Sequence, residues 1–308
     1  MTQMLKSVRK TCAVTILLAV LSLCLSCYNQ MNQTGSQSIQ GDIANLLIDP
    51  PEHGYVTNLP ATKWEESMIT GNGTIGALVT GHPVKERIII SHEKLFMPEN
   101  PPTKAPDLGG NLDAIREFVL NGEGAKASEL SLQLGEEVGI DGMIWTDPLI
   151  PACQMEIEPL DKEPVTNYSR SVNYETGEAT TAWTTKHGIF KRTIFASRAD
   201  GILVLRINSQ DGVPSSFRIR LAQLPVEEGE SNDEEQEFLS GDLIEHVSSP
   251  ILESGVLKYT TDFRKKWEGS LKGYTVETRV SGCDGGMRTD GDWLYLEGCT
   301  DVLLTTGI

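Results

Sequence analysis

The stretch YSRSVNYETGEATTAWTTKHGIFKRTIFASRADGILVLRINS, residues 168–209, decides the fold. Apolar or β-branched side chains alternate with polar ones along four short runs, which is typical of strands with one buried face. The four runs are residues 168–174, 178–185, 190–197 and 202–209. Between the first two runs, Glu175-Thr176-Gly177 has the composition of a hairpin turn. The segment therefore predicts antiparallel strands joined by short turns.

Similar runs continue on both sides of this segment. They are residues 73–81, 86–91, 153–158, 217–224, 256–263, 274–280, 293–297 and 302–306. Many short strands at regular spacing, without alternation of strand and helix, favour packed antiparallel sheets. The sequence therefore predicts a mainly β fold, a large antiparallel β-sandwich (supersandwich), over residues 42–308.

One region has the period of a helix rather than of a strand. Leu112, Ile115, Phe118 and Val119 share one helical face within residues 111–135. Gly122 ends the first of two short helices. We expect a short helical insertion that packs against a sheet and carries no chemistry of its own.

The first 27 residues have the pattern of an export signal. Lys6, Arg9 and Lys10 precede an apolar run that is too short for an ordinary membrane span and ends just before Cys27. A small residue before such a Cys is typical of a bacterial lipoprotein, in which the thiol is lipidated; an ordinary secretory signal is the alternative. Residues 28–41 read as a flexible tether. The protein is therefore expected to be exported and lipid-anchored in a bacterial cell envelope.

Charge and cysteine content exclude several functions. The chain has 26 Lys and Arg against 43 Asp and Glu, a net charge of -17, so binding to nucleic acid is not expected. Neither a zinc-ligand spacing nor a cofactor motif is present, so the sequence predicts no metal and no cofactor. Cys153, Cys283 and Cys299 remain after the signal; the last two flank a predicted hairpin and either pair or stay free.

Five segments resemble, in the same order, the N-terminal domain of glycoside hydrolase family 95, the α-L-fucosidase type. Residues 64–77 are similar to W-x-E-A-x-P-x-G-N-G-x-x-G-A, and residues 86–96 to E-R-x-x-L-N-E-D-T-L-W. The helical region 112–134 follows L-x-x-I-R-x-L-L-x-x-G. Residues 168–179 are similar to Y-x-R-x-L-x-L-x-T-G-x-A, and residues 190–206 to Y-x-R-E-x-F-A-S followed by V-x-R-L.

The resemblance implies a domain of an inverting glycoside hydrolase that degrades glycans. In that family the catalytic carboxylates lie in an (α/α)6 barrel that follows the sandwich, so no catalytic residue is carried over to this chain. The sequence stops directly after the strand at 302–306, so we expect a barrel encoded downstream or as a separate subunit. A stand-alone, lipid-anchored carbohydrate-binding module is the alternative.

Four residues are candidates for contact with a glycan: Trp64, Asn72, His92 and Glu93. His92 and Glu93 replace part of the family's Asn-Glu-Asp, which makes the chain a divergent member. Tryptophans also stack on sugar rings, although a buried aromatic is the default in a sandwich. The five tryptophans are Trp64, Trp145, Trp183, Trp267 and Trp293.

Overall fold

The computed structural model describes residues 47–98, 105–140, 147–210, 212–224, 244–248 and 255–308. The predicted signal peptide, the tether, Cys27 and Trp145 lie outside the described residues. No helix in these ranges is long and apolar enough to span a membrane.

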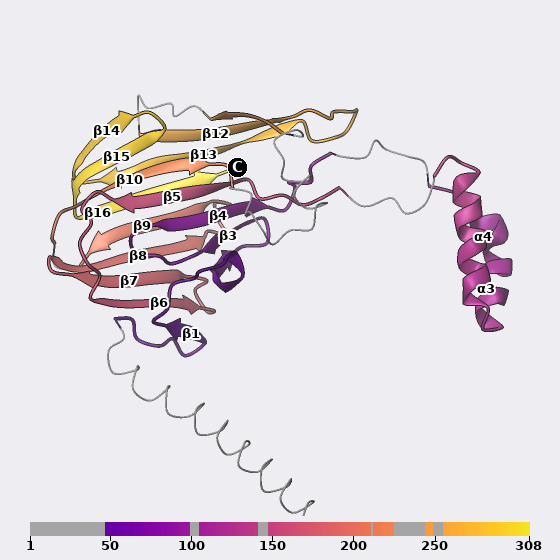
Figure 1. Ribbon diagram of the computed structural model, residues 1–308, viewed down its shortest axis with the longest axis horizontal. Helices are drawn as coiled ribbons and strands as arrows, with labels where there is room; N and C mark the ends of the chain where they lie inside the picture. Colours follow the sequence, from indigo (N-terminus) through magenta and orange to yellow (C-terminus); the bar gives the residue numbers. More distant parts are fainter. Residues whose placement is uncertain (1–46, 99–104, 141–146, 211, 225–243, 249–254) are drawn as a thin grey trace, which may run out of the picture.

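Two antiparallel sheets face each other and form a sandwich (Figure 1). The nine-stranded sheet runs in the order β1 (Gly54–Thr57), β6 (Asn167–Asn173), β7 (Ala179–Thr185), β8 (Gly188–Ala196), β9 (Leu203–Ser209), β16 (Asp301–Gly307), β13 (Gly273–Cys283), β12 (Val256–Phe263) and β11 (Ile244–Ser248). The seven-stranded sheet runs in the order β14 (Gly286–Asp290), β15 (Trp293–Cys299), β10 (Ser215–Ala222), β5 (Cys153–Pro159), β4 (Glu86–His92), β3 (Ile75–Val79) and β2 (Met68–Gly71). The predicted β-sandwich is confirmed.

The segment 168–209 forms four consecutive neighbours in the nine-stranded sheet, β6 to β9. The predicted turn at Gly177 is confirmed, and this glycine has a φ of 71°. Strand β14 is the first strand of the hairpin predicted between Cys283 and Cys299, whereas strands β1, β2 and β11 were not predicted. Each of the unpredicted strands has four or five residues, too few to establish a period.

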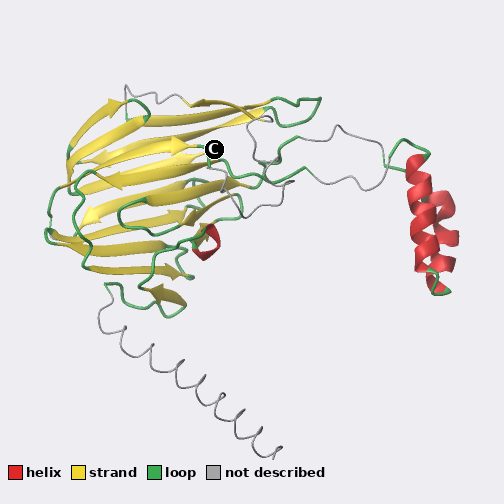
Figure 2. Cartoon of the chain, in the orientation of Figure 1, coloured by secondary structure: helices red, strands yellow, loops and turns green. Residues whose placement is uncertain are grey.

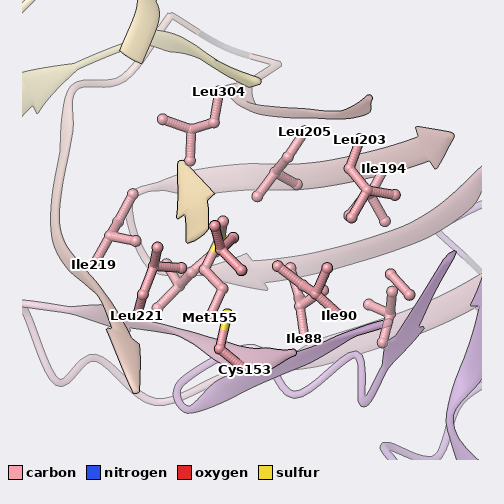
Figure 3. Close-up of a cluster of buried hydrophobic side chains, with 14 of the residues drawn as sticks. Ile88, Ile90, Cys153, Met155, Ile194, Leu203, Leu205, Ile219, Leu221 and Leu304 are labelled. Atoms are coloured by element: carbon pink, nitrogen blue, oxygen red, sulfur yellow. The ribbon is translucent and has the colours of Figure 1, made fainter. Parts of the chain in front are cut away.

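The core lies between the sheets, where side chains from both meet (Figure 3). Leu203, Leu205 and Ile207 alternate along β9 with more exposed residues. Ile219 on β10 and Met155 on β5 belong to the same buried cluster on the other sheet. Burial of these apolar side chains is the main favourable term that holds the layers together.

The helical insertion forms an α-hairpin between β4 and β5 (Figure 2). Helix α3 spans Leu112–Leu120 and α4 spans Gly124–Glu136, and Gly122 between them has a φ of 77°. Two short 3-10 helices, η2 (Trp64–Glu66) and η3 (Gly109–Asn111), complete the helical elements of the described ranges.

The prediction that this hairpin packs against a sheet is wrong. Figure 1 shows it standing away from both sheets. Its apolar residues pack helix on helix, yet no residue of α3 is buried, and Leu120 is 85% exposed. The stem brings Phe96 and Leu149 together in an isolated bridge. An apolar stripe predicts that a helix packs against something, but not which element it meets.

A buried polar network joins the sheets at the loop between β3 and β4. Three successive carbonyl groups of this loop accept hydrogen bonds from the opposite sheet. The donors are Arg170 Nη1 to Thr80 O at 3.0 Å, Tyr168 Oη to Gly81 O at 2.5 Å, and Arg192 Nη2 to His82 O at 2.6 Å. Since a buried carbonyl without a partner is costly, these donors fix the position of the loop.

Glu86 completes the network on the side of the loop. Its Oε1 accepts from Thr80 Oγ1 at 2.7 Å and from Gly81 N at 2.8 Å, and its Oε2 lies 3.2 Å from Arg192 Nη2. The side chains of Glu86 and Arg192 are 1% and 4% exposed. Burial lowers the pKa of Arg192, and the Glu86 carboxylate opposes that shift.

Gly81 is required where the network is most crowded. Its φ is 73°, and an added Cβ would lie 2.9 Å from Arg170 Cδ and 3.0 Å from Tyr168 Oη. The donors therefore reach the carbonyl groups only because this position has no side chain.

Replacing Arg192 by Met should destabilise the fold strongly, because Glu86 would remain buried without its charge partner. We expect Arg192→Met to lower the free energy of unfolding by about 3–5 kcal/mol. The control is Arg206→Met, which removes an exposed pair with Asp301 (59% and 47% exposed). It should cost about 1 kcal/mol or less. Urea unfolding of both variants measures the difference, and equal losses would contradict the role of the buried pair.

Candidate functional site

Three of the four predicted glycan-contact residues lie together at one end of the seven-stranded sheet. Asn72 is in the turn between β2 and β3, and β4 ends at His92, which pairs with Ile75. The backbone N–H of Glu93 donates to Thr74 O at 2.8 Å. The chain then enters the stem of the helical insertion, so these residues lie at its base.

The side chain of Asn72 is fully engaged within the protein. Its Oδ1 accepts from the backbone N–H groups of Thr74 and Ile75, both at 2.9 Å. Its Nδ2 donates to Ser197 O at 2.7 Å, which links this turn to the end of β8 in the other sheet. Gly73 in this turn has a φ of 95°, a conformation that favours glycine. The side-chain amide of Asn72 thus has a structural role: it holds the β2–β3 turn and links it to the other sheet.

Trp64 lies at the other end of β2, in η2 before the strand begins. Its side chain is 52% exposed, so its ring faces solvent. Because β2 separates it from Asn72 by the length of the strand, roughly 13 Å at 3.3 Å per residue, the structure does not bring the four candidates into one site.

A separate cavity of about 160 Å³ opens between the two sheets. Its floor is apolar and comes from strands of both sheets, and its rim comes from the connecting loops. The floor residues include Ile157, Trp183, Phe190, Ile207 and Phe217. The rim includes Val84, Asp161, Glu163 and His187 from these loops, together with Ser216 at the start of β10. Sequence reasoning named only Trp183 among these, because the cavity joins strands that are far apart in the chain.

Trp183 is held in place by two neighbours on β8. Its ring stacks on Phe190 with centroids 5.8 Å apart and planes at 25°, and the Arg192 guanidinium lies 4.7 Å from the ring centre. A cation over an indole is a favourable contact, most of all where both groups are shielded from water. Arg192, which also binds the β3–β4 loop, therefore holds in place the Trp183 ring that forms part of the cavity floor.

The rim carries an ion pair that lowers the pKa of one of its carboxyl groups. Glu163 Oε1 lies 2.7 Å from Lys186 Nζ and 3.8 Å from His187 Nε2, and the lysine holds the pKa of Glu163 below its usual value. A proton donor for glycoside hydrolysis needs a raised pKa instead. Among the described residues, the carboxyl groups with a shifted pKa all have a lowered one. These are Glu66, Glu163, Glu277, Asp284 and Asp301.

The arrangement is suited to holding a small ring. An apolar floor would cover one face of such a ring, and the hydroxyl and carboxylate groups of the rim would meet its polar edge. Within the described residues, no group of three or more His, Cys, Asp or Glu side chains is placed to hold a metal ion.

His82 shapes the loop beside this cavity. Its Nδ1 accepts from the backbone N–H groups of Val84 at 3.2 Å and Lys85 at 3.1 Å, which requires the neutral ring. Burial lowers the pKa of His82 from 6.5; Glu86 opposes this shift, and Arg192 adds to it.

The fold and the site define an antiparallel β-sandwich domain with an internal cavity. The protein belongs to the family described as glycosyl hydrolase family 65, N-terminal domain. The model of that family matches residues 55–307. The resemblance found in the sequence is confirmed at the level of a glycoside hydrolase N-terminal domain. The finer assignment to family 95 stays a prediction.

The search of curated proteins found no match. Among solved structures, the chain is similar to a protein described as a putative kojibiose phosphorylase from human microbiome, with a TM-score of 0.40 and 10% identity. The match covers 84% of this chain and 32% of that one, so the chain spans about a third of the length of that protein.

Acidification should weaken the fold through His82. Its contribution to stability is complete above pH 6.5, the ordinary pKa that applies to the unfolded chain, and is lost as pH falls through the lower folded value. His82→Asn keeps an acceptor for the loop N–H groups without titrating, so the loss of stability below pH 6.5 should be smaller than in the parent.

Urea unfolding at pH 7.5 and pH 5.5, at constant ionic strength, measures this effect. The matched control is His92→Asn, which removes a ring whose Nδ1 accepts only one backbone bond, from Lys94 N at 3.2 Å. It should keep the acid sensitivity of the parent. The same loss in His82→Asn as in the parent would contradict the prediction.

Proposed function

We propose that the chain is the non-catalytic N-terminal sandwich of a glycan-degrading enzyme of the α-L-fucosidase type. The observation that carries this proposal is the family match over residues 55–307, which coincides with the two sheets. A companion (α/α)6 barrel would supply the proton donor and the base that activates water. The sandwich would pack beside that barrel and support its substrate.

The exposed apolar side chains of the helical hairpin are evidence for a companion domain. Leu120, Leu132 and Val119 are 85%, 54% and 58% exposed, and the hairpin projects away from both sheets (Figure 1). Exposed apolar side chains that gather on a projecting element favour contact with another domain. His92 and Glu93 lie where this insertion leaves the sandwich, so they are placed to line the same interface.

The fucosidase part of the proposal rests on sequence motifs. Residues 168–179 and 190–206 are the segments most specific to family 95, and residues 64–77 add its G-N-G turn. The proposed substrate is a glycan that ends in L-fucose or in a related deoxy or galacto sugar.

A second candidate function is glycan binding by the isolated chain, and the inter-sheet cavity favours it. The cavity combines an apolar floor that contains Trp183 with a polar rim, which is the composition of many small-molecule sites. Under this alternative, L-fucose should raise the melting temperature of the chain, and Trp183→Ala should abolish that rise.

The hydrolysis of aryl α-L-fucoside tests the main proposal. The purified chain should show no turnover above buffer, whereas its complex with the proposed companion barrel should hydrolyse the fucoside in preference to an aryl α-glucoside. Turnover by the chain alone that persists through repeated affinity purification would contradict the non-catalytic role. Preference of the complex for the glucoside would remove the fucosidase assignment only.

Export and anchoring are proposed from the N-terminal pattern. Expression of the full gene in a bacterial host should place the protein in the membrane fraction, with Cys27 as the acylated first residue. Cys27→Ser should release it from that fraction. Mass spectrometry of the N-terminal peptide measures the modification. Identical fractionation of the two proteins would favour an ordinary secretory signal.

A further inference from the structure

Two thiols from opposite sheets meet at one lateral edge of the sandwich. Cys283 is the last residue of β13 in the nine-stranded sheet, and Cys299 is the last residue of β15 in the seven-stranded sheet. Their sulfur atoms lie 2.9 Å apart, and both thiols are free. A disulfide needs about 2.05 Å between its sulfur atoms, so a movement of less than 1 Å would bring them to bonding distance.

The backbone around the thiols is built for this close approach. Gly285 donates its N–H to Cys283 Sγ at 3.4 Å. A Cβ on Gly285 would lie 2.7 Å from Cys299 Sγ and 2.3 Å from Glu297 O. Only a residue without a side chain therefore lets the segment after Cys283 pass over the end of β15.

A neighbouring carboxylate holds the same two segments together. Asp284 Oδ1 accepts from Thr300 N at 2.8 Å and from Asp301 N at 3.2 Å, and its Oδ2 accepts from the Thr300 hydroxyl. These bonds lower the pKa of Asp284. The residue after each cysteine is thus fixed to the other segment, which preorganises the two sulfur atoms.

We propose that Cys283 and Cys299 are a site of oxidation that forms a disulfide between the two sheets. The oxidant is a low-molecular-weight or protein disulfide. The thiolate of Cys283, the half-buried partner, attacks one sulfur of that disulfide and releases one thiol. Burial raises the pKa of Cys299 to about 12, so this thiol loses its proton as its sulfur attacks Cys283 Sγ in the mixed disulfide, and the second external thiol is released. Two protein thiols are oxidised while one external disulfide is reduced to two thiols.

The crosslink would close a loop that contains the whole β14–β15 hairpin, at the edge of the seven-stranded sheet. Closing a loop of this length restricts the unfolded chain, so the oxidised protein should melt roughly 5–10 °C above the reduced one. Cys153 is 0% exposed in the core, and burial raises its pKa far above the usual range, so it should stay reduced.

The test compares the full chain after incubation with reduced and with oxidised glutathione. Trypsin cuts after Arg279 and Arg288, so the two cysteines leave in separate peptides, 280–288 and 289–308. Mass spectrometry should find these peptides linked only in the oxidised sample. The melting temperature should depend on the glutathione redox state in the parent and in Cys153→Ser, but not in Cys283→Ser or Cys299→Ser.

A glycine pair gives a second readout that leaves both thiols in place. Gly285→Ala should prevent the link, whereas Gly286→Ala should not, because its nearest neighbour to an added Cβ is 3.8 Å away. Separate alkylation of the two cysteines after oxidation would overturn the proposal. A linked peptide without any change in melting temperature would equally overturn the claim that the bond clamps the sheets.

Discussion

Three consecutive carbonyl groups, at residues 80–82, depend on three donors that all come from the other sheet. The apolar core holds two layers together but does not set how one layer is placed on the other, because the hydrophobic effect has no direction. Hydrogen bonds have direction, and a buried donor or acceptor without a partner is costly. The network around Glu86 and Arg192 therefore defines one arrangement of the sheets. Because Arg192 also contacts the Trp183 ring, the same network fixes the position of this residue in the cavity floor.

The network explains what the family motifs do in this chain. Glu86, Tyr168, Arg170 and Arg192 lie within the motif segments, and all four join one sheet to the other. Asn72 of the G-N-G turn does the same by its bond to Ser197. The resemblance thus detects a way of assembling the sandwich. It carries little information about a sugar, which is why the motifs identify the domain more securely than its substrate.

The sequence could predict the strands, because alternation reports which face of a strand is buried. It could also have revealed the network, since Glu86, Arg170 and Arg192 occupy core-facing positions beside Ile88, Val172 and Ile194. A charge at such a position needs a buried partner. The partner itself, the pairing order of the strands and the cavity could not be predicted, because each depends on contacts between distant segments. Trp64 was predicted to contact a glycan because of its residue type, and residue type does not determine where a side chain lies in the fold.

The two lateral edges of the sandwich are closed by different chemistry. At the edge formed by β2, Thr70 Oγ1 donates to Gly177 O at 2.6 Å. At the opposite edge the chain itself crosses between the sheets, from β15 to β16, and there Asp284 and the thiol pair hold the crossing. Polar bonds at the first edge form and break with the fold, whereas a covalent bond at the second would persist in the unfolded chain. In an oxidising compartment, a disulfide at this edge would add most to stability, because the β14–β15 hairpin lies at the end of its sheet, where local unfolding begins most easily.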